Sequence, residues 1–452
     1  MSANPPAANL PRLVTDLDEA RALLTRRRGF EEPSLSPRMQ EGIRRVFGAD
    51  LTADEVVDRI LRDVRDDGDP AVLRYSAAFD GAAPAEVEVP RAVWIDALAA
   101  LAPDLRDALR TATDRITTFH RKQVRTSWID WAEDGALGQL VRPLERVGLY
   151  VPGGTAVYPS SLLMTAIPAR VAGVREIVVC SPPGPDGEIS PLILAAAEVA
   201  GVDRVFRIGG VQAIAAMAYG TATVPHVDKI YGPGNIFVVL AKQKVYGAVA
   251  IDQLPGPTET LLVADSSADP EFAAADMIAQ AEHDPMATAI LLTTSRSLAE
   301  AVLAEIPLQL ADLERGSIAG QSLAANGIVA VVPNVETAID LANAYAPEHL
   351  CLLLRDPWSA VPLVKHAGGV FVGEDSPEAL ADYVTGPSHV MPTGGTARFF
   401  SPIHVGEFTK VISVAAANRR ALRGLGPHAA ALARAEGLTG HAAAIERRLN
   451  RD

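Results

Sequence analysis

The chain has 452 residues, of which 41 are basic and 55 acidic, so its formal net charge is −14 at pH 7. This balance argues against nucleic acid or an anionic membrane surface as the main partner. A chain of this length exceeds one ordinary hydrophobic core, so two or more domains are expected.

The apolar residues and the cysteines narrow the class of protein further. Apolar stretches are short and broken by Gly, Pro or charged residues, so none predicts a membrane span. The only cysteines are Cys180 and Cys351, which excludes a disulfide framework and a cysteine-rich zinc site. The first residues carry no basic patch followed by an apolar run, so no secretory signal is expected. We therefore predict a cytoplasmic α/β protein.

The N-terminal part of the chain lacks an alternation of strands and helices. Residues 1–20 are rich in Pro and Ala without periodicity, which predicts a disordered lead-in. Residues 21–142 are expected to form a helical region that packs on the second of the two α/β units described next. Thr52 and Glu55 have the spacing of a capping box. Residues 133–144 have the composition of a turn-rich connection.

From Val147 onwards, short apolar runs alternate with helical patterns, and the series occurs twice. The first series predicts an α/β unit at residues 143–250, and the second predicts another at residues 251–403. Repeated strand-loop-helix connections of short length predict mostly parallel sheets covered on both faces. The expected fold class is α/β, with two Rossmann-like units side by side.

The C-terminal tail, residues 404–452, has short helical patterns with Gly and Thr breaks and a basic end. It is too short and too rich in alanine to bury a core alone. We expect it to pack on the body of the protein or on another subunit.

Three glycine-containing loops follow predicted strands of the first unit, at residues 152–155, 208–212 and 231–235. Glycines at such positions let backbone amides approach a phosphate, and the next helix offers its N-terminal dipole. None of the three is a G-x-G-x-x-G fingerprint followed by an acidic residue. A tight turn without a ligand therefore explains each loop equally well.

Two pairs of residues could bind a metal ion. Gln280 and His283 are three apart at the end of a helix predicted after Pro270, so an amide oxygen and an imidazole project from one face. Alone, an ordinary helix C-terminus explains this pair better. In the tail, Glu436 and His441 supply a carboxylate and an imidazole on a segment without a core, and these are candidate further ligands.

A second group of polar residues could move protons or hold a substrate. Glu348 and His349 are adjacent just before a predicted strand, where a carboxylate and an imidazole can exchange protons near neutral pH. An exposed turn is the alternative explanation for such a pair. Thr258, Asp382 and His389 also fall at ends of predicted strands and helices in the second unit, where open α/β sheets place ligands.

Taken together, these residues resemble the histidinol dehydrogenase family. The resemblance extends from about Arg62 to the C-terminus, and its motifs occur in the family's order. They are Phe79–Gly81, Val147–Ser161, Ile208–Ala215, Gly232–Asn235, Gly256–Glu259, Gln280–His283, Asn343–His349, Asp382–Tyr383 and Ser388–Thr393.

The resemblance implies a zinc ion and NAD as cofactors of a homodimer. The implied zinc ligands are Gln280, His283, Asp382 and His441, the last donated by the tail of the partner subunit. The implied NAD contacts are Tyr150, Gln212 and Asn235. The implied catalytic pair is Glu348 and His349. The implied substrate contacts are Thr258, Gln280, His283, Glu348, Asp382, His389, Glu436 and His441.

The implied reaction oxidises L-histidinol twice, through L-histidinal to L-histidine, with NAD as the oxidant in the last steps of histidine biosynthesis. One alternative is a related zinc- and NAD-dependent dehydrogenase of another small polyol, such as sulfopropanediol. A non-catalytic nucleotide-binding protein is a further alternative. The chain departs from the family pattern at Thr258, where many members have Ser, and at residues 386–388 before His389. It also departs at residues 251–255, to which we assign no ligand role.

Overall fold

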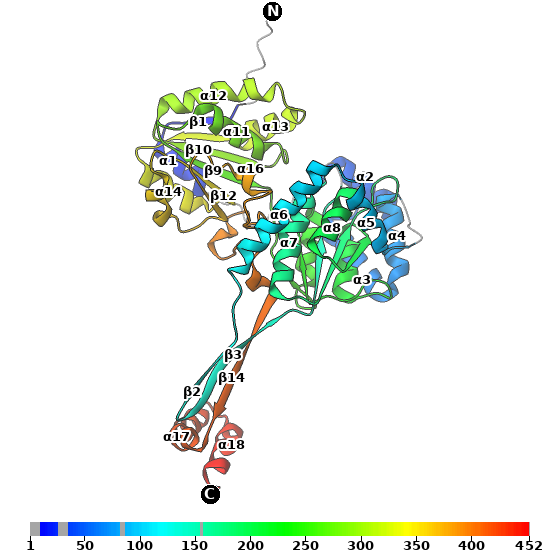
Figure 1. Ribbon diagram of the computed structural model, residues 1–452, viewed down its shortest axis with the longest axis vertical. Coiled ribbons are helices and arrows are strands. Elements are labelled where there is room, and N and C mark those ends of the chain that lie inside the picture. Colours follow the sequence, from blue (N-terminus) through cyan, green and yellow to red (C-terminus); the bar gives the residue numbers. More distant parts are fainter. Residues whose placement is uncertain (1–9, 26–34, 82–85, 154–156, 452) are drawn as a thin grey trace, which may run out of the picture.

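The computed structural model describes residues 10–25, 35–81, 86–153 and 157–451. Two α/β units lie next to each other, and a long three-stranded arm that ends in two helices projects from them (Figure 1). The predicted α/β class with parallel sheets is confirmed. In the described part of the chain, no helix is both long enough and apolar enough to cross a membrane.

The first unit contains a five-stranded parallel sheet with the order β6-β5-β4-β7-β8. Its strands are β4 (Arg146–Tyr150), β5 (Glu176–Ser181), β6 (Arg204–Arg207), β7 (Lys229–Tyr231) and β8 (Ala250–Ile251). Its helices are α7 (Pro159–Ala172), α8 (Pro191–Ala200), α9 (Gly210–Tyr219) and α10 (Ile236–Val245). The chain proceeds outward from β4 to β6 and then returns to β7 on the other side of β4. Such a reversal opens a crevice at the carboxyl edge of a parallel sheet.

The second unit contains a six-stranded parallel sheet with the order β1-β11-β10-β9-β12-β13 and the same kind of reversal between β9 and β12. Its main strands are β9 (Glu259–Ala264), β10 (Thr288–Thr293), β11 (Ile328–Val331), β12 (His349–Leu353) and β13 (Gly369–Val372). Its α-helices are α11 (Pro270–Ala281), α12 (Arg296–Leu310), α13 (Gly316–Asn326), α14 (Val335–Tyr345), α15 (Pro357–Ala360) and α16 (Glu378–Ala381). Short 3₁₀ turns are η1 (Val361–Leu363), η2 (Thr396–Arg398) and η3 (Val405–Phe408).

The N-terminal segment belongs to the second unit. Strand β1 (Arg12–Val14) pairs with β11 at the edge of the sheet, and helix α1 (Leu17–Thr25) follows it, with Val14 and Leu24 buried. The predicted disordered lead-in is therefore wrong for residues 12–20, and residues 1–9 lie outside the described residues. A three-residue strand is too short to show a periodic pattern in the sequence. It forms because strand β11, distant in the sequence, supplies its hydrogen bonds.

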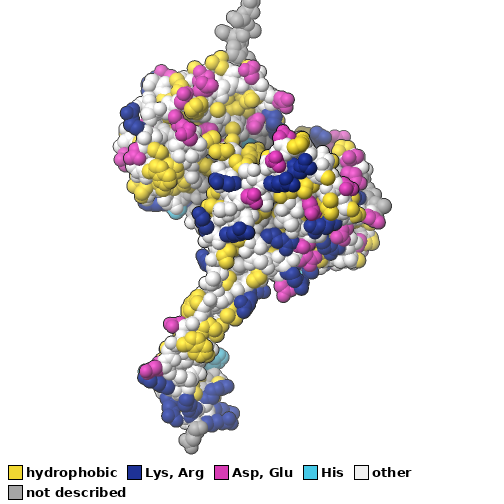
Figure 2. Space-filling model, viewed as in Figure 1, with side chains coloured by type: hydrophobic (Ala, Val, Ile, Leu, Met, Phe, Trp, Pro, Cys, Tyr) yellow, Lys and Arg dark blue, Asp and Glu magenta, His cyan; other side chains and the backbone are white. Residues whose placement is uncertain are grey.

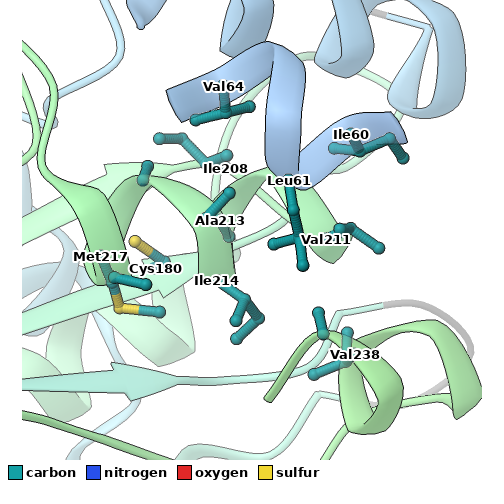
Figure 3. Packing of buried hydrophobic residues seen from close by; sticks show 14 of the residues in the cluster. Ile60, Leu61, Val64, Cys180, Ile208, Val211, Ala213, Ile214, Met217 and Val238 are labelled. Atoms are coloured by element: carbon teal, nitrogen blue, oxygen red, sulfur yellow. The ribbon is translucent and has the colours of Figure 1, made fainter. Parts of the chain in front are cut away.

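The helices that follow pack on the first unit, so the predicted packing on the second unit is wrong for residues 37–121. They are α2 (Pro37–Phe47), α3 (Ala53–Asp67), α4 (Asp69–Asp80), α5 (Arg91–Ala100) and α6 (Pro103–Arg121). Leu61 and Val64 of α3 lie in one buried cluster with Val211 and Ile214 of α9 (Figure 3). An amphipathic stripe fits any apolar surface of suitable shape, so the sequence did not decide between the two units. The capping box at the start of α3 is present.

The arm is an antiparallel sheet with the order β14-β3-β2. Its strands are β2 (Trp128–Ala132), β3 (Gly135–Pro143) and β14 (Thr409–Ala417), and its end carries α17 (Arg419–Ala435) and α18 (Thr439–Leu449). The predicted turn-rich connection is therefore wrong for residues 135–143, which form β3. The tail contains the predicted helices, but its residues 409–417 form a strand that the sequence analysis did not predict. Strand β14 pairs with β3, although the paired residues are more than about 250 positions apart in the sequence. Local sequence patterns do not predict such long-range pairing. Apolar side chains such as Trp131 (77% exposed) and Leu137 face outward.

Candidate active site

The candidate catalytic residues gather at the edge of the second sheet where β9 and β12 begin. Thr258 directly precedes β9, and Glu348 and His349 lie at the start of β12, which pairs with β9 through His349 and Thr260. Gln280 reaches the same edge because α11 follows β9 and runs back along the sheet. Open α/β sheets usually bind ligands at the carboxyl edge. This unit instead brings its polar residues together at the amino edge.

Glu348 is a buried carboxylate held by two donors. The residue is 7% exposed, and its Oε2 accepts hydrogen bonds from the Thr258 hydroxyl (2.6 Å) and from the backbone amide of Glu259 (3.0 Å). Burial raises the pKa of Glu348 to about 7, because the charged form loses more solvation than its neighbours replace. The group can therefore take or give a proton near neutral pH.

His349 is buried, and its two ring nitrogens have different environments. Nδ1 lies 3.0 Å from the carbonyl oxygen of Glu259, so Nδ1 carries the hydrogen and donates it. Nε2 has no hydrogen-bond partner among the described residues, and Asp382 Oδ1 lies 3.8 Å from it. Burial would lower the pKa of His349, but nearby carboxylates outweigh it and raise that pKa to about 10. These carboxylates belong to Glu378, Glu348 and Asp382.

Three side chains predicted to bind metal surround the same edge. Helix α11 ends before His283, which therefore lies in the turn after Gln280 and not on the helix itself. With the Gln280 amide turned to satisfy both of its ends, its oxygen lies 3.3 Å from His349 Nδ1, the ring nitrogen that carries the hydrogen. Burial lowers the pKa of His283. Burial alone would raise the pKa of Asp382, but His349, His389 and His283 together hold it below its usual value.

The charges of this cluster suit a divalent cation. Zinc binds nitrogen and oxygen donors of the kinds found here, namely the His283 imidazole, the Asp382 carboxylate and the Gln280 amide oxygen. A neutral imidazole and an ionised carboxylate are the protonation states that binding requires. Within the described ranges, no Lys or Arg forms an ion pair with Asp382, Glu348 or Glu378. A bound cation would offset this surplus of carboxylates and lower the proton affinity of the neighbouring imidazole.

Glu378 is a site residue that the sequence analysis missed. It is buried at the start of α16, where its Oε2 accepts a hydrogen bond of 2.6 Å from the Thr260 hydroxyl. With the Gln280 amide turned to satisfy both of its ends, the amide nitrogen donates to Glu378 Oε1 over 3.3 Å. Burial raises the pKa of Glu378 to about 7. The available signal was the four-residue spacing to Asp382, which places both carboxylates on one side of a helical turn.

His389 joins this edge to the first unit. Its Nδ1 lies 2.7 Å from the carbonyl oxygen of Asp382, and its Nε2 lies 3.1 Å from the hydroxyl of Ser161 at the start of α7. The neighbouring Ser388 donates to the carbonyl oxygen of Met164 on the same helix over 3.2 Å. Because α7 follows β4, its start lies at the carboxyl edge of the first sheet. The amino edge of one sheet therefore meets the carboxyl edge of the other.

The three predicted NAD contacts lie at that carboxyl edge, beside the reversal between β4 and β7. Tyr150 ends β4, and its hydroxyl accepts a hydrogen bond of 3.1 Å from the backbone amide of Gly210. Gln212 is 1% exposed, and its amide nitrogen has no hydrogen-bond partner in the part of the chain that is described. Asn235 caps α10 by accepting from the amides of residues 237 and 238. Gly154 and Thr155 of the first predicted loop lie outside the described residues.

This arrangement fits a dinucleotide on physical grounds. Buried Gln212 offers a free donor, and the α10 N-terminus offers oriented backbone amides at the crevice. Gly232 has φ +115° and lies so close to Tyr150 that a Cβ there would collide with the Tyr150 carbonyl oxygen. Glycine at this position therefore permits the close packing of two loops.

The family model for histidinol dehydrogenase matches residues 45–449 of this chain. The histidinol dehydrogenase of Deinococcus radiodurans is 55% identical to it over 433 residues, which are 95% of this chain and 98% of that protein. The chain belongs to the histidinol dehydrogenase family. The histidinol dehydrogenase of Thermus thermophilus is 54% identical over 405 residues, covering 90% of this chain and 97% of that protein. A crystal structure of histidinol dehydrogenase from Elizabethkingia anophelis matches with a TM-score of 0.90 at 33% identity and covers 99% of both chains.

Two residues that the family resemblance implies lie away from the others. Glu436 and His441 are exposed near the junction of α17 and α18, at the far end of the arm from both α/β units (Figure 1). Across the described segments, no three or more His, Cys, Asp or Glu side chains are grouped to hold a metal ion. Of the four predicted zinc ligands, this chain brings together Gln280, His283 and Asp382, and His441 lies at the end of the arm, away from them.

Proposed function

We propose that this member of the histidinol dehydrogenase family is a zinc-dependent enzyme that oxidises L-histidinol through L-histidinal to L-histidine with two NAD. The observation that carries the proposal is the buried His349, whose unpartnered Nε2 lies 3.8 Å from Asp382. A buried imidazole nitrogen without a partner is costly unless a ligand meets it. We also propose a cytoplasmic location, in keeping with the buried and unpaired thiols of Cys180 and Cys351.

His349 acts in this proposal as the base of the first oxidation. Its Nδ1–H is anchored on Glu259, so Nε2 is the nitrogen that takes the proton of the alcohol, and NAD when bound would supply the hydride acceptor. Zinc would orient the substrate and act as a Lewis acid. Its ligands would be Gln280, His283 and Asp382 of one chain and His441 of a second copy. His389, Thr258 and Glu436 of the second copy are proposed substrate contacts.

Glu348 acts in the second oxidation. The aldehyde adds water, and the Glu348 carboxylate takes a proton from that water, which leaves the hydrate ready for the second oxidation, for which a second NAD would be the hydride acceptor. A pKa raised to about 7 suits this task, since the group accepts a proton and returns it near neutral pH. The Thr258 hydroxyl and the Glu259 amide fix its orientation.

A homodimer in which the arm reaches the partner would supply Glu436 and His441. Apolar side chains lie along the arm, and Lys and Arg side chains gather at its end (Figure 2). The basic residues of the two terminal helices are Arg419, Arg420, Arg423, Arg434, Arg447 and Arg448. The whole chain carries a formal charge of −14, so a second copy is an electrostatically suitable surface for this end. The apolar strands of the arm also require a covering surface.

NADH formation from L-histidinol tests the proposal directly. We expect two NADH per histidinol, loss of activity after chelation, and recovery when zinc is added back. One NADH per substrate would contradict the double oxidation. Preference for sulfopropanediol would favour the polyol alternative, and NAD binding without turnover of either alcohol would favour a non-catalytic protein.

Glu348→Gln separates the two half-reactions. We expect oxidation of L-histidinal to fall by about 10²–10³-fold, and oxidation of L-histidinol to fall much less, since only the aldehyde step needs the added water. Single-turnover NADH formation from each substrate measures both steps. Glu336→Gln on the exposed face of α14 is the matched control. Equal losses in the two steps would contradict the role assigned to Glu348.

A further inference from the structure

Lys242 and Asp252 form a buried ion pair that the catalytic proposal does not use. Their side chains are 0% and 4% exposed, and the two charged groups are in direct contact. Taking both charges out of water is expensive, and an apolar pair of similar volume is often equally stable or more so. Stability alone therefore does not account for the pair.

Both members of the pair bind the same glycine. The Lys242 ammonium donates to the carbonyl oxygen of Gly232 over 2.9 Å, and Asp252 Oδ2 accepts from the amide of Gly232 over 2.8 Å. Gly232 also lies against the backbone of Tyr150. The pair thus fixes the orientation of the peptide groups on both sides of Gly232, at the start of the turn that ends at Asn235.

The same carboxylate is connected to the catalytic unit. Asp252 Oδ1 accepts from the backbone amide of Gln253 over 2.6 Å, and the Gln253 side chain donates to the carbonyl oxygen of Met391 over 2.8 Å. Met391 lies two residues after His389. The segment at residues 251–255, which departs from the family pattern, therefore joins the turn of the first unit to the polar edge of the second.

We propose that Lys242 and Asp252 are positioning residues that hold the turn at residues 232–235 in the conformation that receives the dinucleotide. The inference rests on the proposed NAD-linked function. Neither side chain is exposed to touch the cofactor, so the pair acts through the peptide groups of Gly232 and the Asn235 cap that follows. A turn held before binding loses less conformational entropy when the ligand arrives.

The test compares NAD affinity and hydrogen exchange in substrate-free protein. The double variant Lys242→Met/Asp252→Leu removes both charges while keeping the volume filled. We expect a lower melting temperature, because the buried amide and carbonyl of Gly232 lose their partners. We also expect NAD affinity weakened by about tenfold or more, and faster amide exchange at Gly232, Gly234 and Asn235 without NAD. Lys242→Met/Asp252→Asn keeps an acceptor for the Gly232 amide, so it is expected to recover part of both losses.

Lys244→Met on the same helix is the matched control, because Lys244 pairs with Asp54 and Asp58 at the surface. Unchanged NAD affinity and unchanged exchange in the double variants would overturn the inference. If the unmodified protein itself does not bind NAD, the proposed function fails, whereas the exchange result still decides whether the pair holds the turn. If the double variants do not fold, Lys242→Arg replaces them, with the same expected losses because its larger head group displaces the Gly232 carbonyl contact.

Discussion

Replacing His349 with Asn lowers kcat for histidinol oxidation by about 10²–10⁴-fold, the usual contribution of a general base. The expected loss follows from the geometry of the ring: Nδ1 is engaged by the Glu259 carbonyl, and Nε2 is the basic atom turned toward Asp382. Asn can still donate a hydrogen bond at the Nδ1 position but cannot accept the alcohol proton. Steady-state NADH formation measures the effect.

Zinc content distinguishes loss of the base from loss of the metal site. Because His349 is not among the proposed ligands, zinc measured by atomic absorption in His349→Asn is expected to stay near one ion per chain, roughly the unmodified level. His226→Asn, on an exposed loop of the first unit, is the matched control. A variant that retains most of its activity, or one that loses zinc in proportion to activity, would contradict the assigned role.

Mixing two inactive variants restores activity if the arm completes the partner's site. His441→Ala and His349→Asn each destroy both sites of their own homodimer. In a mixed dimer, the chain that retains His349 receives His441 from the other chain, so one of its two sites is intact. Random re-association therefore restores about a quarter of the unmodified activity, because half of the dimers are mixed and each has one working site.

The control for this experiment is a mixture of His441→Ala with the double variant His441→Ala/His349→Asn, in which no site can be complete. Dimer exchange is followed by mass difference between tagged and untagged chains. Absence of recovery although mixed dimers form would contradict donation of His441 across the interface. Full activity of the His441→Ala homodimer would contradict its role as a ligand.

In the proposed reaction the two reactants can meet because opposite edges of the two sheets face each other. The carboxyl edge of the first sheet presents Tyr150, Gln212 and the α10 N-terminus, which suits a dinucleotide. The amino edge of the second presents His349 and its carboxylates. The contact between Ser161 and His389 joins the two edges, so a nicotinamide and a substrate carbon can be held face to face.

Local patterns predicted most of the regular elements. Buried parallel strands require continuous apolar runs, and the runs at β5 and β12 are of this kind, with Cys180 and Cys351 inside them. The capping box of α3 and the helix after Pro270 are also purely local features. Long-range pairing was not predictable in the same way. Strand β1 pairs with β11, about 300 residues away in the sequence, and β14 pairs with β3, about 270 residues away.

The candidate site shows the same division. The sequence motifs predicted four site residues, namely Glu348, His349, Gln280 and Asp382. The residue types in these motifs and the order of the motifs along the chain are unusual enough to indicate a family. The missed Glu378 is an ordinary Glu in a short helix until burial and the Thr260 hydroxyl give it a role. A pKa raised by burial depends on neighbours that only the packed fold supplies.

By itself, the sequence determined the α/β class, the two units and the family, since periodicity and motif order are written along the chain. Tertiary structure decided which unit the N-terminal helices cover, which sheet edge carries the candidate catalytic residues and where the tail ends. Strand β14 places Glu436 and His441 at the end of an arm because it pairs with β3 and not with either main sheet. The physical reason is that apolar stripes and backbone hydrogen bonds are not specific for a partner until three-dimensional packing selects one.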